Sequence, residues 1–105
     1  MIAIISCSHY PDDERIYHKE IKSLSLNNLD IKYFTLSDSD MVLSDDRVQH
    51  INYKKSSYSI TEYINLIQLF FKDTPPTVVH IHEPELLSLA VNTKKTFGAK
   101  IIYDV

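Results

Sequence analysis

Two histidines and a glutamate stand at the end of one of the most apolar stretches of this chain. His80 and His82 alternate with branched apolar residues, and Glu83 and Pro84 then interrupt the strand pattern. Residues two apart lie on the same face of a strand, so the two imidazoles share a face. Imidazole and carboxylate groups exchange protons near neutral pH and ligate metals. This corner, formed by His80, His82 and Glu83, is therefore the first candidate for a catalytic or metal-binding site.

The three side chains of the corner have different predicted roles. His82 lies beside the start of a helix predicted from Pro84, where a neutral imidazole is favoured and can accept a proton or hydrogen bond from a hydroxyl. It is the candidate catalytic residue. His80 lies deeper in the strand, and we expect it to be a core residue. Glu83 has the residue type of a general base, but capping of the helix is the favoured interpretation. A metal site is an alternative in which Glu83 or His9 joins the His-x-His pair.

A second polar segment follows the first predicted strand, residues 2–5. It contains Ser6, Cys7, Ser8 and His9, and no glycine. A dinucleotide-binding loop needs glycines so that the backbone can approach the phosphates. The next helix begins with acidic residues 12–14, which would repel a phosphate at the helix N-terminus. An uncharged polyol such as a sugar is therefore the expected ligand. Cys7 has no basic neighbour and is expected to be a small packing residue.

Strand and helix patterns alternate along the chain. Further strands are predicted over residues 30–36, 47–53, 78–81 and 100–105. A first helix begins at Asp12 or Asp13 and stops at residues 27–28. A second begins at a capping box, Ser59 to Glu62, and ends before two prolines. A third runs from Pro84 to about residue 97, with Gly98 as its C-cap. Its predicted inward residues are Leu86, Leu87, Ala90, Val91 and Phe97.

This alternation predicts an α/β, Rossmann-like, doubly wound parallel sheet of five strands in the order 3-2-1-4-5. Ligands of such sheets bind where the strand order reverses, at the carboxyl ends of the strands. In this order the reversal lies between the first and fourth strands. The loop with Ser8 and His9 would then face His82 and Glu83, with Asp104 at the neighbouring strand end.

Composition limits the alternatives. A chain of 105 residues fits one domain, and its net charge of −3 disfavours a nucleic-acid-binding protein. The one cysteine allows no intrachain disulfide and favours a reducing, cytoplasmic compartment. We expect neither a signal peptide nor a membrane-spanning segment. No helix follows the fifth strand, so we expect a sheet that is incomplete at its C-terminal edge, in the front part of a longer protein or in a truncated gene product.

Three segments carry a resemblance to a known family. Residues 8–16 (SHYPDDERI) with Lys19-Glu20 and Ser23-Leu24, residues 80–87 (HIHEPELL) and residues 101–105 (IIYDV) occur in this order. They resemble the N-terminal part of bacterial GT-B glycosyltransferases of the family 4 type. The middle of the chain, about residues 31–74, resembles that family only in its pattern of elements. The glycine pair usual in the first loop of the family is absent here.

The resemblance implies a two-domain retaining enzyme that transfers a sugar from a nucleotide-sugar to a saccharide or lipid-linked acceptor in surface polysaccharide synthesis. Residues 1–105 would be its acceptor-side domain. His82 matches the histidine that faces the reacting sugar, and Ser8 and His9 match the loop beside the acceptor; Glu83 and Asp104 are expected to border the substrate. The resemblance implies no cofactor and no essential metal. It allows peripheral association of the whole enzyme with the inner face of the plasma membrane. The donor would bind to a second domain, so this chain alone is expected to be inactive.

Two other functions remain open from the sequence. One is a stand-alone flavodoxin-like interaction module that binds a partner through its uncovered fifth strand. The other is a small metal-dependent hydrolase that uses His80, His82 and His9.

Overall fold

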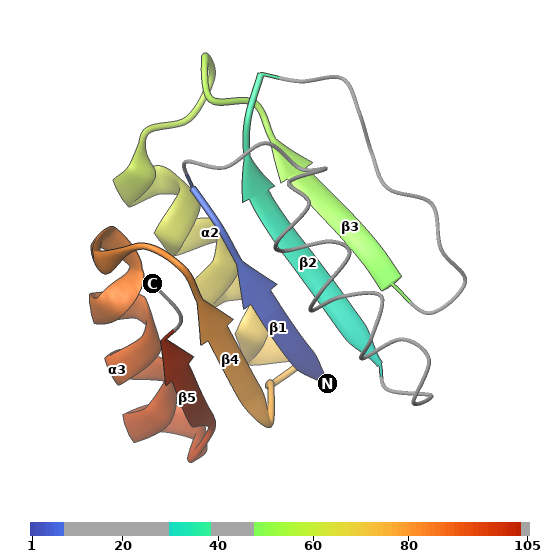
Figure 1. Ribbon diagram of the computed structural model, residues 1–105, viewed down its shortest axis with the longest axis vertical. Helices are drawn as coiled ribbons and strands as arrows, with labels where there is room; N and C mark the ends of the chain where they lie inside the picture. Colours follow the sequence, from blue (N-terminus) through green and yellow to red (C-terminus); the bar gives the residue numbers. More distant parts are fainter. Residues whose placement is uncertain (8–29, 39–47, 104–105) are drawn as a thin grey trace.

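The fold is an open parallel sheet of five strands (Figure 1). The structure is a computed structural model that describes residues 1–7, 30–38 and 48–103 of the chain. The strands are β1 (Ile2–Ile5), β2 (Ile31–Leu36), β3 (Val48–Tyr53), β4 (Val78–Ile81) and β5 (Lys100–Tyr103). Their order is β3-β2-β1-β4-β5, and every pair is parallel. The predicted α/β Rossmann-like fold and its strand order are confirmed.

Helix α2 (Ile60–Asp73) forms where the capping box predicted it. The Ser59 hydroxyl accepts a hydrogen bond from the Glu62 backbone N–H, and the Glu62 carboxylate accepts one from the Ser59 N–H. These bonds satisfy two backbone groups that a helix N-terminus leaves without partners. The helix ends at Thr74, before two consecutive prolines that cannot continue it.

The segment after β4 differs from the single predicted helix. A 3-10 turn, η2 (Pro84–Leu86), comes first, and α3 (Leu87–Phe97) follows it. Gly98 ends α3 with φ of 73°, in the left-handed region that glycine adopts without steric cost. The C-cap prediction is therefore confirmed.

The predicted inward face of this helix was wrong at two positions. Leu87 and Val91 are 38% and 49% exposed, whereas Leu89 and Thr93 are buried. The stripe that faces the sheet runs through residues 86, 89, 90 and 93, in steps of three or four. Leu87 and Val91 lie together on another side of α3, because they are four residues apart.

Both α2 and α3 cover the same face of the sheet (Figure 1). Alternate residues of β1 turn to opposite faces, so that Ile5 packs with the helices and Ile4 packs on the other side. Both are fully buried. Burial on both faces is characteristic of parallel strands and explains why β1 is continuously apolar.

Several predicted features lie outside the described residues. These are the first helix, most of the acidic loop after β2, and the candidate site residues Ser8, His9 and Asp104. Within the described ranges, no helix is long and apolar enough to cross a membrane.

Candidate functional site

The ends of β1 and β4 meet at the carboxyl edge of the sheet, as predicted. The two strands are direct neighbours, with Ile5 paired to Ile81, so the residues that follow them lie side by side. The Ser6 hydroxyl donates a hydrogen bond of 2.9 Å to Oε1 of Glu83, across 77 positions of sequence. Both side chains are buried. A hydroxyl and a carboxylate are thus held together where the strand order reverses.

Tyr63 of α2 fixes this corner from the helix layer. Its hydroxyl donates a 2.8 Å hydrogen bond to the Ser6 carbonyl oxygen, and its side chain is fully buried. Burial, followed by the charges of neighbouring groups, raises the pKa of Tyr63 well above its usual value, so the hydroxyl keeps its proton. Sequence reasoning placed Tyr63 only on an apolar helix face. The signal that it missed is that a buried tyrosine hydroxyl needs a polar partner.

Glu83 does not cap the helix, contrary to the favoured prediction. It occupies the N-cap position of η2, but its side chain makes no capping hydrogen bond. The side chain instead reaches β1, where the buried Ser6 hydroxyl is its partner. The backbone carbonyl of Glu83 accepts from the Leu86 N–H at 3.1 Å and begins the 3-10 turn. Glu83 therefore belongs to the corner and not to the helix end.

His82 is 3% exposed, and its Nδ1 lies 3.4 Å from the carbonyl oxygen of Ile5. A carbonyl oxygen only accepts, so Nδ1 carries the hydrogen in this contact. Nε2 is then the acceptor atom of the neutral ring. This tautomer suits a group that takes a proton from a hydroxyl.

His80 and His82 share a face of the sheet, as their spacing predicts. Their rings stack, with centroids 4.7 Å apart and planes inclined by 21°. His80 is half-buried and lies one pleat deeper than His82. It contacts the ring of His82 and is half-buried, where the sequence predicted a core residue.

Cys7 and Glu85 complete the described part of the corner. The Cys7 thiol is buried and lies 3.8 Å from Oε2 of Glu85. Burial raises the pKa of the Cys7 thiol to about 12, and the negative charges of Glu83 and Glu85 add to this effect. The thiol is therefore protonated at neutral pH, and the predicted packing role of Cys7 is confirmed. The charge of Lys55 acts in the opposite direction and is the smallest of these effects.

A polar row continues from the corner across the sheet. The register pairs Thr35 with Asn52, and the Ser6 N–H continues the β1–β2 ladder by donating to the Phe34 carbonyl. Ser6 therefore lies beside Thr35, with His82 on its other side. The sequence indicated each polar residue but not their alignment, which depends on strand register.

Thr35 and Asn52 of this row form a largely buried network with His50. The Thr35 hydroxyl donates to Oδ1 of Asn52 at 2.6 Å and lies 2.7 Å from Nε2 of His50. Because a hydroxyl has one hydrogen, His50 donates from Nε2. Burial lowers the pKa of His50 to about 4, so the ring is neutral near pH 7. Sequence reasoning assigned no role to these side chains.

The metal alternative gains no support from the described residues. Among them, no group of three or more His, Cys, Asp or Glu side chains is placed to hold a metal ion. His80, His82 and Glu83 meet at one strand end, but Glu83 turns to Ser6. His9, the remaining predicted ligand, lies outside the described ranges.

Comparisons with protein-family models, with curated proteins and with solved structures found no match to this chain.

Proposed function

We propose that this chain is the acceptor-side domain of a retaining glycosyltransferase that transfers a sugar from a nucleotide-sugar to a saccharide or lipid-linked acceptor. The observation that carries the proposal is the corner at the reversal of strand order, where His82, Glu83 and Ser6 gather. Ligands of open parallel sheets bind at this position. The sequence resemblance of residues 80–87 to GT-B enzymes of the family 4 type supports the same function.

The electrostatics of the corner favour a neutral ligand over a phosphate. Glu83 and Glu85 both act on Cys7 with negative charge, at the end of the strand where a dinucleotide-binding protein presents glycines and backbone N–H groups. A phosphate would meet these charges at close range. Sugar hydroxyls carry no charge and both donate and accept hydrogen bonds, so they suit carboxylate and imidazole partners.

In this proposal each residue has a defined task. His82, with its hydrogen on Nδ1, accepts a hydrogen bond from a sugar hydroxyl through Nε2. Glu83, held by Ser6, supplies a carboxylate beside it, and His80 keeps the His82 ring in place. Ser8, His9 and Asp104 border the substrate. The nucleotide-sugar binds to a second domain, and the whole enzyme works in the cytoplasm at the inner face of the membrane.

A binding measurement on two histidine variants tests the role of His82. The ligands are methyl hexopyranosides, titrated into the isotopically labelled 105-residue chain and followed by NMR. We expect His82→Gln to weaken binding about tenfold, the equivalent of one lost hydrogen bond. His50→Gln is the matched control, because it replaces a buried histidine of the same sheet face, and its affinity should stay within about twofold of the parent. Equal effects of both substitutions would contradict the proposal.

The proposal also predicts that the 105-residue chain does not transfer sugar by itself, because its corner repels phosphate. A nucleotide-sugar incubated with the purified chain and an acceptor saccharide should remain intact by chromatography. Release of the nucleoside diphosphate in proportion to the amount of chain would show a donor site within residues 1–105. It would contradict the proposal that the nucleotide-sugar binds to a second domain.

One observation favours a second candidate, an interaction module that binds a partner chain through β5. This strand forms an edge of the sheet, and Ile102 and Tyr103 on it are 40% and 39% exposed. An exposed apolar edge strand is a template for pairing with another chain. The sugar titration separates the two candidates, because an interaction module leaves the amides of Ser6 and His82 unshifted by every pyranoside, whereas the acceptor-side domain shifts them.

A further inference from the structure

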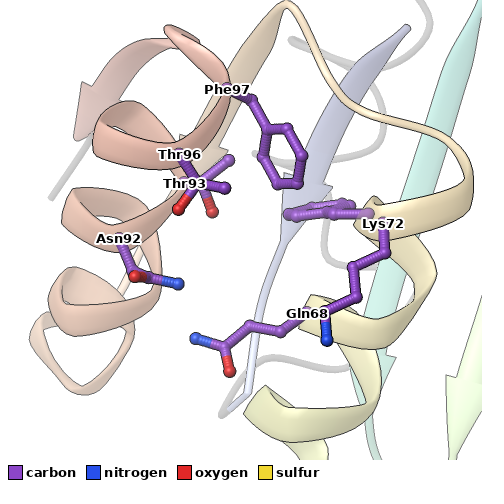
Figure 2. Close-up of a pocket in the computed structure, with 7 residues that line it drawn as sticks. Gln68, Lys72, Asn92, Thr93, Thr96 and Phe97 are labelled. Carbon is purple, nitrogen blue, oxygen red and sulfur yellow. The ribbon is translucent and has the colours of Figure 1, made fainter.

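A groove between α2 and α3 forms a second pocket, remote from the corner (Figure 2). Its volume is about 150 Å³, and it is lined by the C-terminal halves of both helices. Because α2 leads directly into the start of β4, this groove lies toward the amino ends of the strands. The corner lies at their carboxyl ends. A ligand in the groove would therefore not touch His82 or Glu83.

Four polar side chains from the two helices line the groove. Gln68 and Lys72 are four residues apart on α2, and Asn92 and Thr96 are four apart on α3, so each pair shares a helix face. Figure 2 shows the amides of Gln68 and Asn92 pointing toward each other. Within the described part of the chain, none of these four side chains has a hydrogen bond or ion pair. Gln68 is half-buried and the other three are exposed, so their polar groups are accessible to a ligand.

The walls between these polar groups are apolar. Phe71 is fully buried beneath the groove, and Phe97 is half-buried at its upper end. Among the described residues that line the groove, Lys72 is the one charged side chain. The groove thus combines one positive charge, two amides, a hydroxyl and two aromatic surfaces.

We propose that this groove binds a small polyhydroxylated carboxylate, such as a hexuronate. The Lys72 ammonium pairs with the carboxylate, while the amides of Gln68 and Asn92 and the Thr96 hydroxyl bond the ring hydroxyls. The C–H face of the ring packs on Phe97. The volume exceeds the roughly 10–15 Å³ that one water needs and is below the roughly 300 Å³ of pockets for large ligands. It therefore suits a single sugar ring.

The test compares two probes that differ only in charge. D-Glucuronate and its neutral carboxamide are titrated separately into the labelled 105-residue chain, and amide shifts are followed by NMR. Glucuronate should shift the amides of residues 68–72 and 92–97, with a Kd on the order of 1 mM. The carboxamide should bind at least about fivefold more weakly, because it cannot pair with Lys72. Equal binding of the two probes, or the absence of shifts at these residues, would overturn the proposal.

Two substitutions show whether the charge of Lys72 is responsible. Lys72→Gln should weaken glucuronate about fivefold and leave the carboxamide unchanged, since only the charged probe loses a partner. Lys94→Gln is the matched control, because Lys94 is an exposed lysine of α3 outside the groove lining, and it should change neither probe. A weakening by both substitutions would indicate general charge attraction and would reject the site. Shifts confined to residues 5–7 and 81–85 would also reject the groove while leaving the function proposed for the corner standing.

Discussion

The two polar clusters at the carboxyl edge of the sheet differ in what they hold. The corner between β1 and β4 contains the carboxylate of Glu83, the Ser6 hydroxyl and the His82 ring. The cluster between β2 and β3 contains Thr35, His50 and Asn52, none of which carries a charge near pH 7. Both are largely buried and share one row of the sheet. The corner lies where the strand order reverses, and Tyr63 connects it to α2.

The comparison shows that burial of polar groups does not by itself define a site. In the β2–β3 cluster, Thr35 donates to Asn52 and accepts from His50, and Asn52 donates to the Ser37 carbonyl oxygen. Buried polar groups must find partners, and a structural network is the usual outcome. The corner adds the carboxylate of Glu83 and the imidazole of His82, and these are the groups on which the proposed sugar site depends.

The largest expected difference between the clusters concerns the reactivity of Cys7 at the corner. Because the pKa of Cys7 is raised from 9.0 to about 12, the native thiol has about 1,000-fold less thiolate than the unfolded chain at pH 7. We expect a disulfide reagent to modify native Cys7 at least about 100-fold more slowly than the chain in urea. Comparable rates, measured by absorbance, would mean that the pKa of Cys7 is not raised in the folded chain.

The β2–β3 cluster should respond to acid through His50. Its pKa falls from 6.5 to about 4 on folding, so the unfolded chain binds more protons between these values. The stabilisation from neutral His50 is therefore complete above pH 6.5 and is lost as the pH falls toward 4, by up to about 3 kcal/mol. Urea unfolding at pH 7 and near pH 4 measures this loss. His50→Gln should remove that part of the pH dependence. An unchanged pH dependence in this variant would show that His50 is not its cause.

Removal of the Ser6 hydroxyl should destabilise the corner. Ser6→Ala leaves Oε1 of Glu83 buried without its 2.9 Å donor, at a cost of about 2 kcal/mol in the free energy of unfolding. A double-mutant cycle with Glu83→Gln isolates this bond from other effects of the two substitutions. If the two losses simply add, Ser6 and Glu83 are not coupled and the corner is not a unit.

The smallest expected effect is at Tyr63. Tyr63→Phe removes only the hydroxyl that donates to the Ser6 carbonyl and should cost about 1 kcal/mol. Tyr58→Phe is the matched control at an exposed tyrosine just before α2, and its unfolding free energy should hardly change. Equal losses in both variants, measured by urea unfolding, would mean that the bond from Tyr63 to the Ser6 carbonyl does not stabilise the corner.

The sequence was sufficient where local patterns decide the outcome. The capping box at Ser59, the glycine at residue 98 and the alternation of strands with helices predicted α2, the end of α3 and the strand order. Side-chain partners were not predictable in the same way. Ser6 and Glu83 are 77 positions apart, and Tyr63 and Ser6 are 57 apart, so their contacts depend on the register and packing of the whole sheet.

The error at Glu83 has the same origin. Its position before Pro84 is that of an N-cap, and local reasoning favours capping there. The buried Ser6 hydroxyl on the neighbouring strand offers a partner that local sequence does not reveal. Two other predictions for this segment were also wrong. A 3-10 turn at residues 84–86 precedes α3, and Leu87 and Val91 are exposed instead of facing the sheet.

The most direct measurement of the central claim is an NMR titration of the labelled 105-residue chain with methyl hexopyranosides and, separately, with uridine diphosphate. The account predicts that at least one pyranoside shifts the amides of Ser6, Cys7, His82 and Glu83, and that the nucleotide leaves them unchanged. Shifts of these amides by the nucleotide, or by no pyranoside at all, would contradict the assignment of the corner to sugar hydroxyls.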